Sequence, residues 1–537
     1  MKKSKRIVAM LICVLFTVTL FAGCGSKATD SDADKTGKTD TGAETKGTND
    51  PITITCMFSD HPSQPYQEET WVLPKVIKEK FNITMEMQAI PSSAFEEKRN
   101  ATLASGDIPD IIVGMEKIVA DDYGRKGMFI NFMNYKNIMP NMLATLEKYE
   151  PLKVHMVSPD EFYVMPGQSV TMGTVSASAN LLPLVRMDIL KDLGLSTPNT
   201  YDELYDMLVQ MKKAYPDSFP WIDRCRLTTM FSVLSAGLGL FSCPSGACNT
   251  GWTVFSPATE IFTDVMEEEN FKFFIEFMKK CYDDGLLDPN YATDTTTEWE
   301  SKLMSSKGFF TVDYFARPDM MTTIARSSGD EKFSLEAILP PAIEGGQQKT
   351  YALIGVRGFN VTSAKTKHPE RVCEMIDFWV YSEEGCLLTT YGMKDVTFKV
   401  KDGKKLERIY TDTVKTQLDF DAAYGVNYLT FWNFKPDFYG YDLFDENASY
   451  YYNQPWQLFE DKLLSPPPAV IFNAGESEKY NEYRIDLNDE RLSVLNQFIM
   501  GERPMSEWDK AIKELHEIGM ADYLELINSA YKRIYNK

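Results

Sequence analysis

Histidine and paired cysteines are scarce in this 537-residue chain. The four histidines, His61, His155, His368 and His516, are far apart, and no two of the nine cysteines form a C-x-x-C pair. A protein zinc site needs three or four such ligands brought together, usually with some of them closely spaced. The sequence therefore argues against a zinc site, and we expect neither a metal nor a cofactor.

Sequence motifs of common catalytic machineries are also absent. The chain contains no G-x-S-x-G, no H-E-x-x-H and no P-loop. Carboxylates are abundant, so residue types alone leave a glycosidase-like pair of acids open. These absences favour a binding protein over an enzyme.

Positive charge is in short supply. Lys and Arg number 56 against 77 Asp and Glu, which gives a formal net charge of −21. An acidic surface repels phosphate backbones and anionic headgroups, so we exclude nucleic acid as a partner. Acidity by itself names no ligand.

Only one long apolar run occurs, from Ile7 to Phe21, and a basic head precedes it. The small pair Ala22-Gly23 and then Cys24 follow this run. Such a pattern predicts an export signal over residues 1–23, cut before a cysteine that receives a lipid. We expect a lipid-anchored protein on the outer face of a bacterial cytoplasmic membrane. The alternative is a plain secretory signal with an incidental cysteine.

Residues 24–50 carry no large apolar side chain beyond the lipidated cysteine, so we expect a disordered tether there. Roughly 490 residues remain, enough for two or three domains. Cys243 and Cys248 bracket a turn-rich loop, and the sequence leaves open whether they form a disulfide or stay as free thiols.

The folded part begins with alternating strands and helices. Strand patterns at 52–58, 83–90 and 111–113 are separated by helical patterns near 72–81 and 93–105. This order predicts an α/β fold with a largely parallel sheet. The alternation of helices and strands recurs later in the chain. A helix follows Thr200, which forms a predicted capping box with Glu203. The other predicted elements are helices at 271–282 and 369–381, a strand at 308–312, and a final helical region capped by Ser506.

Four segments in chain order resemble the extracellular solute-binding protein family 1, the substrate-binding lipoproteins of carbohydrate-type ABC importers. They are LASGDIPDIIVG from Leu103, VRMDILKDLGLSTPNTYDELYDML from Val185, GLLDPNYAT from Gly285, and HPERVCEMIDFWVYSEEGCLLTTYGM from His368. Met393-Lys394-Asp395 departs from the glycine that many relatives have after the Tyr-Gly pair.

The resemblance implies a two-lobe, periplasmic-binding-protein-like (Venus flytrap) fold with hinge-crossing strands and the ligand between the lobes. It implies a first lobe of residues 51–170 and 357–405 and a second lobe of 171–356 and 406–537. It also implies an extracellular receptor, expected to be a monomer, that delivers an oligosaccharide to ABC permease subunits. A peptide or other small-molecule receptor, a ligand sensor for a signalling system and an exported glycan-acting enzyme are the alternatives.

Ligands of open α/β sheets lie beyond the carboxyl ends of the strands. Asp60, Met115 and Asp313 occupy such ends. The two carboxylates can accept bonds from sugar hydroxyls, or can instead cap a helix or a turn. Tyr314 falls where the resemblance implies an aromatic side chain lining the cleft.

Aromatic rings suit the C–H faces of sugars. Fourteen aromatic residues lie between Tyr424 and Phe459, and among them we expect Trp432, next to the amide of Asn433, to stack on the ligand. We add Trp252 and Arg186 as candidates, with a structural salt bridge as the alternative for Arg186. Trp379 and Trp508 lie on amphipathic patterns and are expected in the core.

Overall fold

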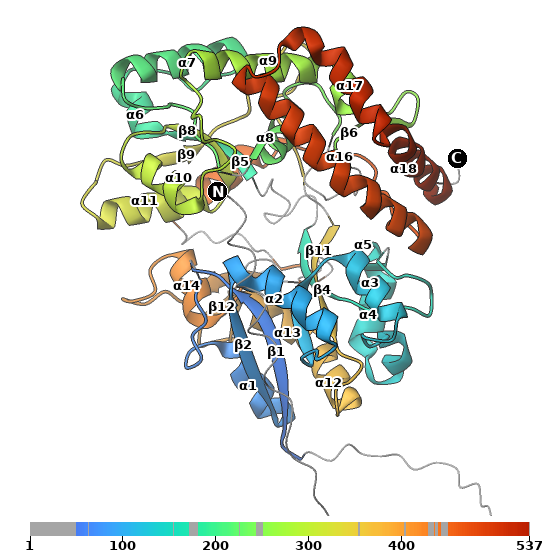
Figure 1. Cartoon of the computed structure of the whole chain (residues 1–537). Helices are drawn as coiled ribbons and strands as arrows, with labels where there is room; N and C mark the ends of the chain where they lie inside the picture. The colour runs from blue at the N-terminus through green and yellow to red at the C-terminus, as the bar shows by residue number, and fades with distance from the viewer. Residues whose placement is uncertain are drawn as a thin grey trace, which may run out of the picture. The chain divides into compact units, whose positions relative to one another are not determined.

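The computed structural model describes residues 50–535 apart from 63, 154, 171–180, 225, 243–250, 353–354, 402–403, 428–433, 435–438 and 442–448. The predicted signal peptide and the predicted lipidation site Cys24, together with Cys243, Cys248, Trp432 and Asn433, lie outside the described residues. The described elements form a mixed α/β fold around two large hydrophobic cores (Figure 1). We call the parts built on these cores the first and the second lobe.

The first lobe is built on a five-stranded sheet. Its order is β2-β1-β3-β11-β4, with β2 and β3 parallel to β1, and with β11 antiparallel to its neighbours β3 and β4. The parallel order predicted for the first three strands is therefore confirmed. The strands are β1 Ile52–Asp60, β2 Ile83–Pro91, β3 Ile111–Met115, β4 Met165–Val170 and β11 Gly355–Thr362.

The loop that follows LASGD ties the centre of this sheet together. Asp110 Oδ2 accepts bonds from the backbone N–H and the hydroxyl of Thr55, at 2.8 and 3.0 Å. Gly106 ends the preceding helix with φ of 70°, a conformation that favours glycine. This motif thus fixes where β3 starts beside β1.

Helices surround this sheet and fill the first core with it. They are α1 Val72–Phe81, α2 Ser92–Ser105, α3 Lys117–Arg125, α4 Pro140–Lys148, α5 Glu150–Lys153, α12 Pro369–Ile376, α13 Glu383–Tyr391 and α14 Gln417–Tyr424, with the hairpin β12 Phe398–Lys401 and β13 Lys405–Arg408. α12 continues into a wider helical turn at Asp377–Tyr381, and the predicted core residue Trp379 is buried there.

Part of the chain beyond residue 405 packs into the first core. Val414, Phe420, Val426 and Phe434 are all buried in it. The family resemblance instead implies the second lobe for this stretch. The packing shows that the chain, which enters the first lobe with β11, stays in it as far as Phe434.

The second lobe holds a three-stranded sheet of order β8-β5-β9. Both β8 and β9 run antiparallel to β5, so they run in the same direction as each other. Of these three strands the sequence predicts only β8, and it cannot show that the entering strand β5 lies between β8 and β9. The strands are β5 Leu181–Arg186, β8 Phe310–Tyr314 and β9 Leu335–Ala337, with the pairs β6 Thr253–Ser256 and β7 Ile261–Asp264, and β10 Thr350–Tyr351 and β14 Leu463–Leu464.

Strand β5 is buried on both faces. Leu181 and Val185 face the second core, whereas Leu182 and Leu184 face a smaller cluster around Trp299. Alternate side chains of a strand point to opposite faces, so a run of apolar residues suits a strand covered on both sides.

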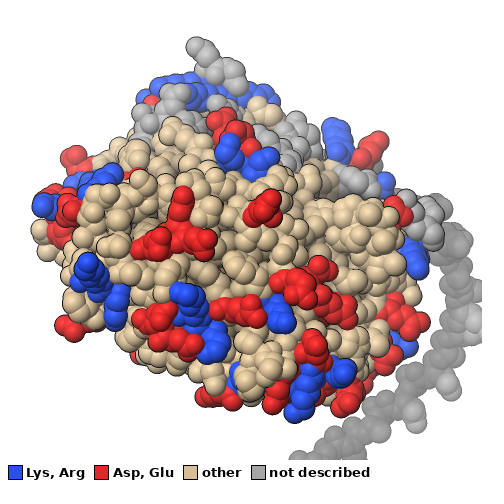
Figure 2. All heavy atoms as spheres, turned by 90° about the horizontal axis from the view of Figure 1, so that it is seen from above, with Lys and Arg blue, Asp and Glu red and all other residues tan. Residues whose placement is uncertain are grey.

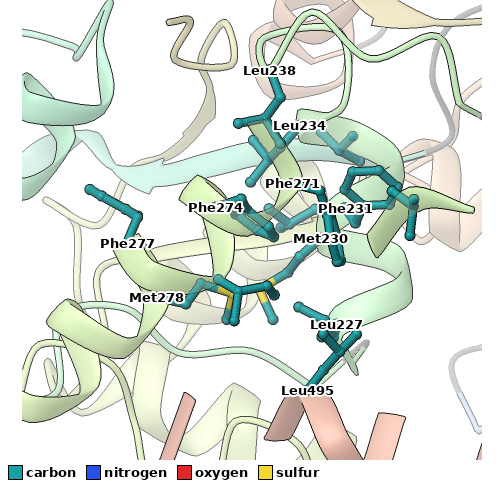
Figure 3. Close-up of a cluster of buried hydrophobic side chains, with 14 of the residues drawn as sticks. Leu227, Met230, Phe231, Leu234, Leu238, Phe271, Phe274, Phe277, Met278 and Leu495 are labelled. Carbon is teal, nitrogen blue, oxygen red and sulfur yellow. The ribbon is translucent and has the colours of Figure 1, made fainter. Parts of the chain in front are cut away.

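The second core is mainly helical (Figure 3). Phe231 and Met230 of α8 meet Phe271 and Phe274 of α9, with Leu495 of α16 close by. The helices of this lobe are α6 Met187–Asp192, α7 Tyr201–Ala214, α8 Arg226–Leu234, α9 Glu269–Asp283, α10 Thr296–Met304, α11 Arg317–Ser327, α15 Tyr450–Phe459, α16 Ala474–Met500, α17 Trp508–Glu517 and α18 Met520–Tyr535.

Two predicted caps differ from the structure. Thr200 does cap α7, but the Glu203 carboxylate accepts from Asn199 N–H, one residue earlier than a capping box requires. Ser506 lies inside a 3₁₀ turn, Met505–Glu507, and Glu507 is the N-cap of α17. The turn moves the N-cap by one residue, from Ser506 to Glu507, while Trp508 is buried as predicted.

Charged side chains of both signs are interspersed over the face in Figure 2 and do not gather in one patch. Exposed pairs on α9 follow the same pattern, with Lys279 bound to Asp283 and Lys280 to Asp284. Such pairs contribute little stability, and this surface serves mainly solubility.

Candidate ligand-binding site

The carboxyl end of β8 holds a buried aspartate between two arginines. Arg224 Nη2 donates to Asp313 Oδ1 at 2.8 Å, and its Nε lies 2.8 Å from Oδ2. Arg317, at the start of α11, donates from Nε to Asp313 Oδ1 at 3.3 Å and from Nη1 to Glu300 of α10 at 2.8 Å. The backbone N–H of Tyr314 also donates to Asp313, at 2.7 Å.

Aromatic rings support both guanidinium groups. Arg224 and Arg317 lie over the buried Trp299 ring, at 5.1 and 5.2 Å from its centroid. Arg224 also lies 5.7 Å from the Tyr314 ring. Cation–π contacts of this kind hold a planar guanidinium in a fixed orientation. We call Arg224, Arg317, Asp313, Glu300, Trp299 and Tyr314 the Arg224 cluster.

Tyr314 is the member of this cluster that meets solvent most openly. Its side chain is 41% exposed, although Asp313 before it is fully buried. The next ring, Phe315, packs 4.7 Å from Trp456 of α15, which belongs to the aromatic run found in the sequence. The end of β8 therefore presents a tyrosine ring on a rigid, aromatic base.

The charges of this cluster affect the pKa of His61, which immediately follows β1 in the first lobe. Burial lowers the pKa of His61, and the positive charges of Arg317 and Arg224 lower it further. Asp60 and Glu300 act in the opposite direction. Since charges act most strongly at short range, we expect the ends of β1 and β8 to face a common region.

Asp60 already makes one bond within its own lobe. Its Oδ1 accepts from the backbone N–H of Tyr66 at 2.9 Å, which fixes the turn after β1. The residue is half-buried. A carboxylate has acceptor capacity beyond one bond, so this turn role and a ligand contact are compatible.

The sequence-predicted residues fall into three groups. Asp313 and Tyr314 lie in the Arg224 cluster, and Asp60 lies next to His61. Asp313 is fully buried and bound by both arginines, so its role is to position them. Met115 is 5% exposed and belongs to the first core. Trp432 and Asn433 stay untested because the structure does not describe them.

Arg186 and Trp252 are structural residues. Arg186 is 2% exposed, forms two bonds to Asp188 and one to the carbonyl of Leu303, and lies 4.1 Å from the centroid of Phe333. Trp252 is stacked on Phe231 with rings 7° from parallel. Neither has a face left for a ligand, and for Arg186 the structural alternative is the correct one.

Sequence reasoning missed Arg224, Arg317, Trp299 and Glu300 as site residues. Asp313 and Arg317 are four residues apart across the start of α11, a spacing that allows an ion pair and was a usable signal. Nothing in the sequence connects Arg224, almost 90 residues earlier, to Asp313.

Among the described residues, no three His, Cys, Asp or Glu side chains gather as metal ligands would. None of the described helices is long and apolar enough to cross a membrane.

Curated proteins similar to this chain include three bacterial relatives. Lipoprotein LipO of Bacillus subtilis is 22% identical over 82% of this chain and 85% of its own length. The polygalacturonan/rhamnogalacturonan-binding protein YtcQ of the same species is 22% identical over 98% of both chains. The fructooligosaccharide ABC transporter substrate-binding protein FusA of Streptococcus pneumoniae is 23% identical over 96% and 97%. No protein-family model matches the chain.

Solved structures show the same architecture. FusA of S. pneumoniae in complex with kestose has a TM-score of 0.71 at 19% identity, covering 90% of this chain and 100% of that one. The alginate-binding protein AlgQ2, solved without calcium ion, has a TM-score of 0.70 at 20% identity, covering 90% and 99%. These likenesses establish the class of fold, a two-lobe solute-binding protein fold.

Proposed function

We propose that this protein binds an oligosaccharide between its lobes and delivers it to an ABC importer. The observation that carries the proposal is the Arg224 cluster, with the exposed ring of Tyr314 on a rigid base and His61 of the other lobe close by. Sugars are bound by flat rings against their C–H faces and by charged or amide groups on their hydroxyls.

The similar proteins support the same proposal. Two of the relatives are named for binding polygalacturonan or fructooligosaccharide, and their likeness extends over nearly the whole chain. Delivery to a transporter needs no catalytic group in the receptor, and we propose that this protein catalyses no reaction. On the same basis we propose that the chain belongs to the extracellular solute-binding protein family 1.

A panel of oligosaccharides read by thermal unfolding tests the binding step. A ligand that binds only the folded state raises the melting temperature. At a free ligand concentration of one hundred times Kd, the free energy of unfolding rises by about 2.7 kcal/mol. We expect at least one oligosaccharide to do so, with calorimetry confirming a single site. A panel in which peptides raise the melting temperature and sugars do not would contradict the proposal.

We further propose that lobe closure and lipid anchoring belong to this function. Small-angle scattering should give a smaller radius of gyration with a saturating oligosaccharide than without it. Cys24→Ala should release the protein from membranes, as its sequence setting predicts. If the Cys24→Ala protein fractionates with membranes as the wild type does, the anchor lies elsewhere.

A further inference from the structure

The charges of the Arg224 cluster neutralise one another. Arg224 pairs with Asp313, and Arg317 pairs with both Asp313 and Glu300. Two guanidinium groups thus face two carboxylates, and all four are held in direct contacts of 2.8 to 3.3 Å. Neither arginine is left as an uncompensated positive charge.

Groups beside the cluster add negative charge. Asp60 also acts on His61, and burial together with the two arginines lowers the pKa of His61 below its usual 6.5. The imidazole is therefore neutral at pH 7. Within the Arg224 cluster two arginines stand against two carboxylates, so its own charges sum to zero, and Asp60 adds a negative charge on the side of His61.

We infer that the site selects neutral oligosaccharides and rejects those that carry carboxylates, such as uronic acid polymers. This inference rests on the proposed function and names the class of sugar within it. A uronate would add a second net negative charge to a region that already carries one. To pair with an arginine, it would have to share a guanidinium whose charge Asp313 or Glu300 already neutralises.

Neutral hydroxyls meet no such obstacle. A hydroxyl can donate to an outer oxygen of Glu300 or Asp60 and accept from a guanidinium N–H without breaking the ion pairs. Specificity then arises from repulsion of the wrong ligand as much as from attraction of the right one. The exposed ring of Tyr314 contributes equally to either class, because it contacts the C–H face of a sugar.

The test compares each uronate oligosaccharide with its carboxyl-reduced counterpart, which has the same linkage and length. The panel also holds neutral fructo-, manno- and xylo-oligosaccharides. We expect ligands among the neutral sugars, and at least tenfold weaker binding for the uronate partner of any neutral ligand. A uronate that binds more tightly than its reduced counterpart overturns the inference but leaves the proposed function intact. A panel without any sugar ligand overturns both.

A charge variant tests the cause. Glu300→Gln removes one negative charge from the cluster. It should reduce the ratio of the two dissociation constants, uronate over neutral counterpart, by about tenfold. Glu298→Gln is the matched control, since it removes the same charge from the same helix. Glu298 instead forms the capping box of α10, a role that Gln also fills. An unchanged ratio in Glu300→Gln, including a uronate that remains undetectable, contradicts the inference.

Discussion

Arg186 and Arg224 occupy closely matched settings in the second lobe. Each guanidinium pairs with an aspartate and lies over an aromatic ring, Phe333 for Arg186 and Trp299 for Arg224. The difference lies in what surrounds them. Arg186 also binds the carbonyl of Leu303 and is sealed from solvent, whereas Arg224 lies beside the exposed ring of Tyr314.

This comparison shows why residue type alone does not identify a site. Both arginines stabilise the lobe, but only the second lies where an outside molecule can reach an adjoining aromatic ring. Only the second also acts on a residue of the other lobe, His61. We therefore propose that the ligand binds beside Arg224, and we expect substitutions in the two clusters to separate folding from binding.

The largest expected effect is on stability at the closed cluster. Arg186→Ala leaves Asp188 and the Leu303 carbonyl without their partner, and breaking such a buried pair costs about 3–5 kcal/mol of unfolding free energy. Urea denaturation measures this loss. Lys126→Ala, which removes an exposed pair with Asp122, should change stability by less than about 1 kcal/mol. Equal losses in both variants would contradict the structural role of Arg186.

His155 of the first lobe extends the comparison to the pH dependence of stability. Burial, with a smaller contribution from Lys117, lowers the pKa of His155 to about 3 from 6.5. Since the unfolded chain then binds more protons between these values, stability should fall as pH drops from about 6.5 toward 3. The slope attributable to His155 is at most about 1.4 kcal/mol per pH unit.

Denaturation of the wild type and His155→Gln over pH 4–7 isolates that slope. We expect the wild type to lose stability more steeply than the variant as pH falls. Parallel curves would mean that His155 becomes protonated in the folded protein near its ordinary pKa.

At the open cluster the expected loss is in affinity. Tyr314→Ala should weaken binding of the neutral oligosaccharide by about 1.5–3 kcal/mol, because a stacked ring contributes both its geometry and its buried area. Stability should change by less than about 1 kcal/mol, since the side chain is 41% exposed. Tyr314→Phe, which keeps the ring, is the control and should retain most of the affinity. Calorimetry and urea denaturation of the same samples give both quantities.

The smallest expected effect tests whether the lobes meet at this cluster. Arg317→Met removes a positive charge that lowers the pKa of His61, so that pKa should rise in the variant. Proton NMR titration can follow the pKa of His61, because the chain has only four histidines whose signals must be told apart. Arg326→Met is the control, because Arg326 binds Tyr451 and does not act on His61. An unchanged His61 pKa in Arg317→Met would separate His61 from the cluster.

Much of the fold followed from local sequence signals. The predicted strand starting at Ile52 and helix α7, with its buried Leu204 and Met211, match the structure closely, because periodicity and caps act over a few residues. The candidate site could be predicted from the sequence only in part. Asp313 and Tyr314 stand at a strand end that the pattern located, but whether a ring such as Trp252 is covered depends on Phe231, which lies far away in the sequence.

A crystal structure of the protein with the tightest-binding neutral oligosaccharide of the panel tests the central claim most directly. We predict a sugar ring whose C–H face lies within about 4.5 Å of the Tyr314 ring, the distance of an apolar contact. We also predict that the Arg224–Asp313 and Arg317–Glu300 pairs remain intact around it. An oligosaccharide bound elsewhere, with the Tyr314 ring uncovered, would contradict the placement of the site at the end of β8.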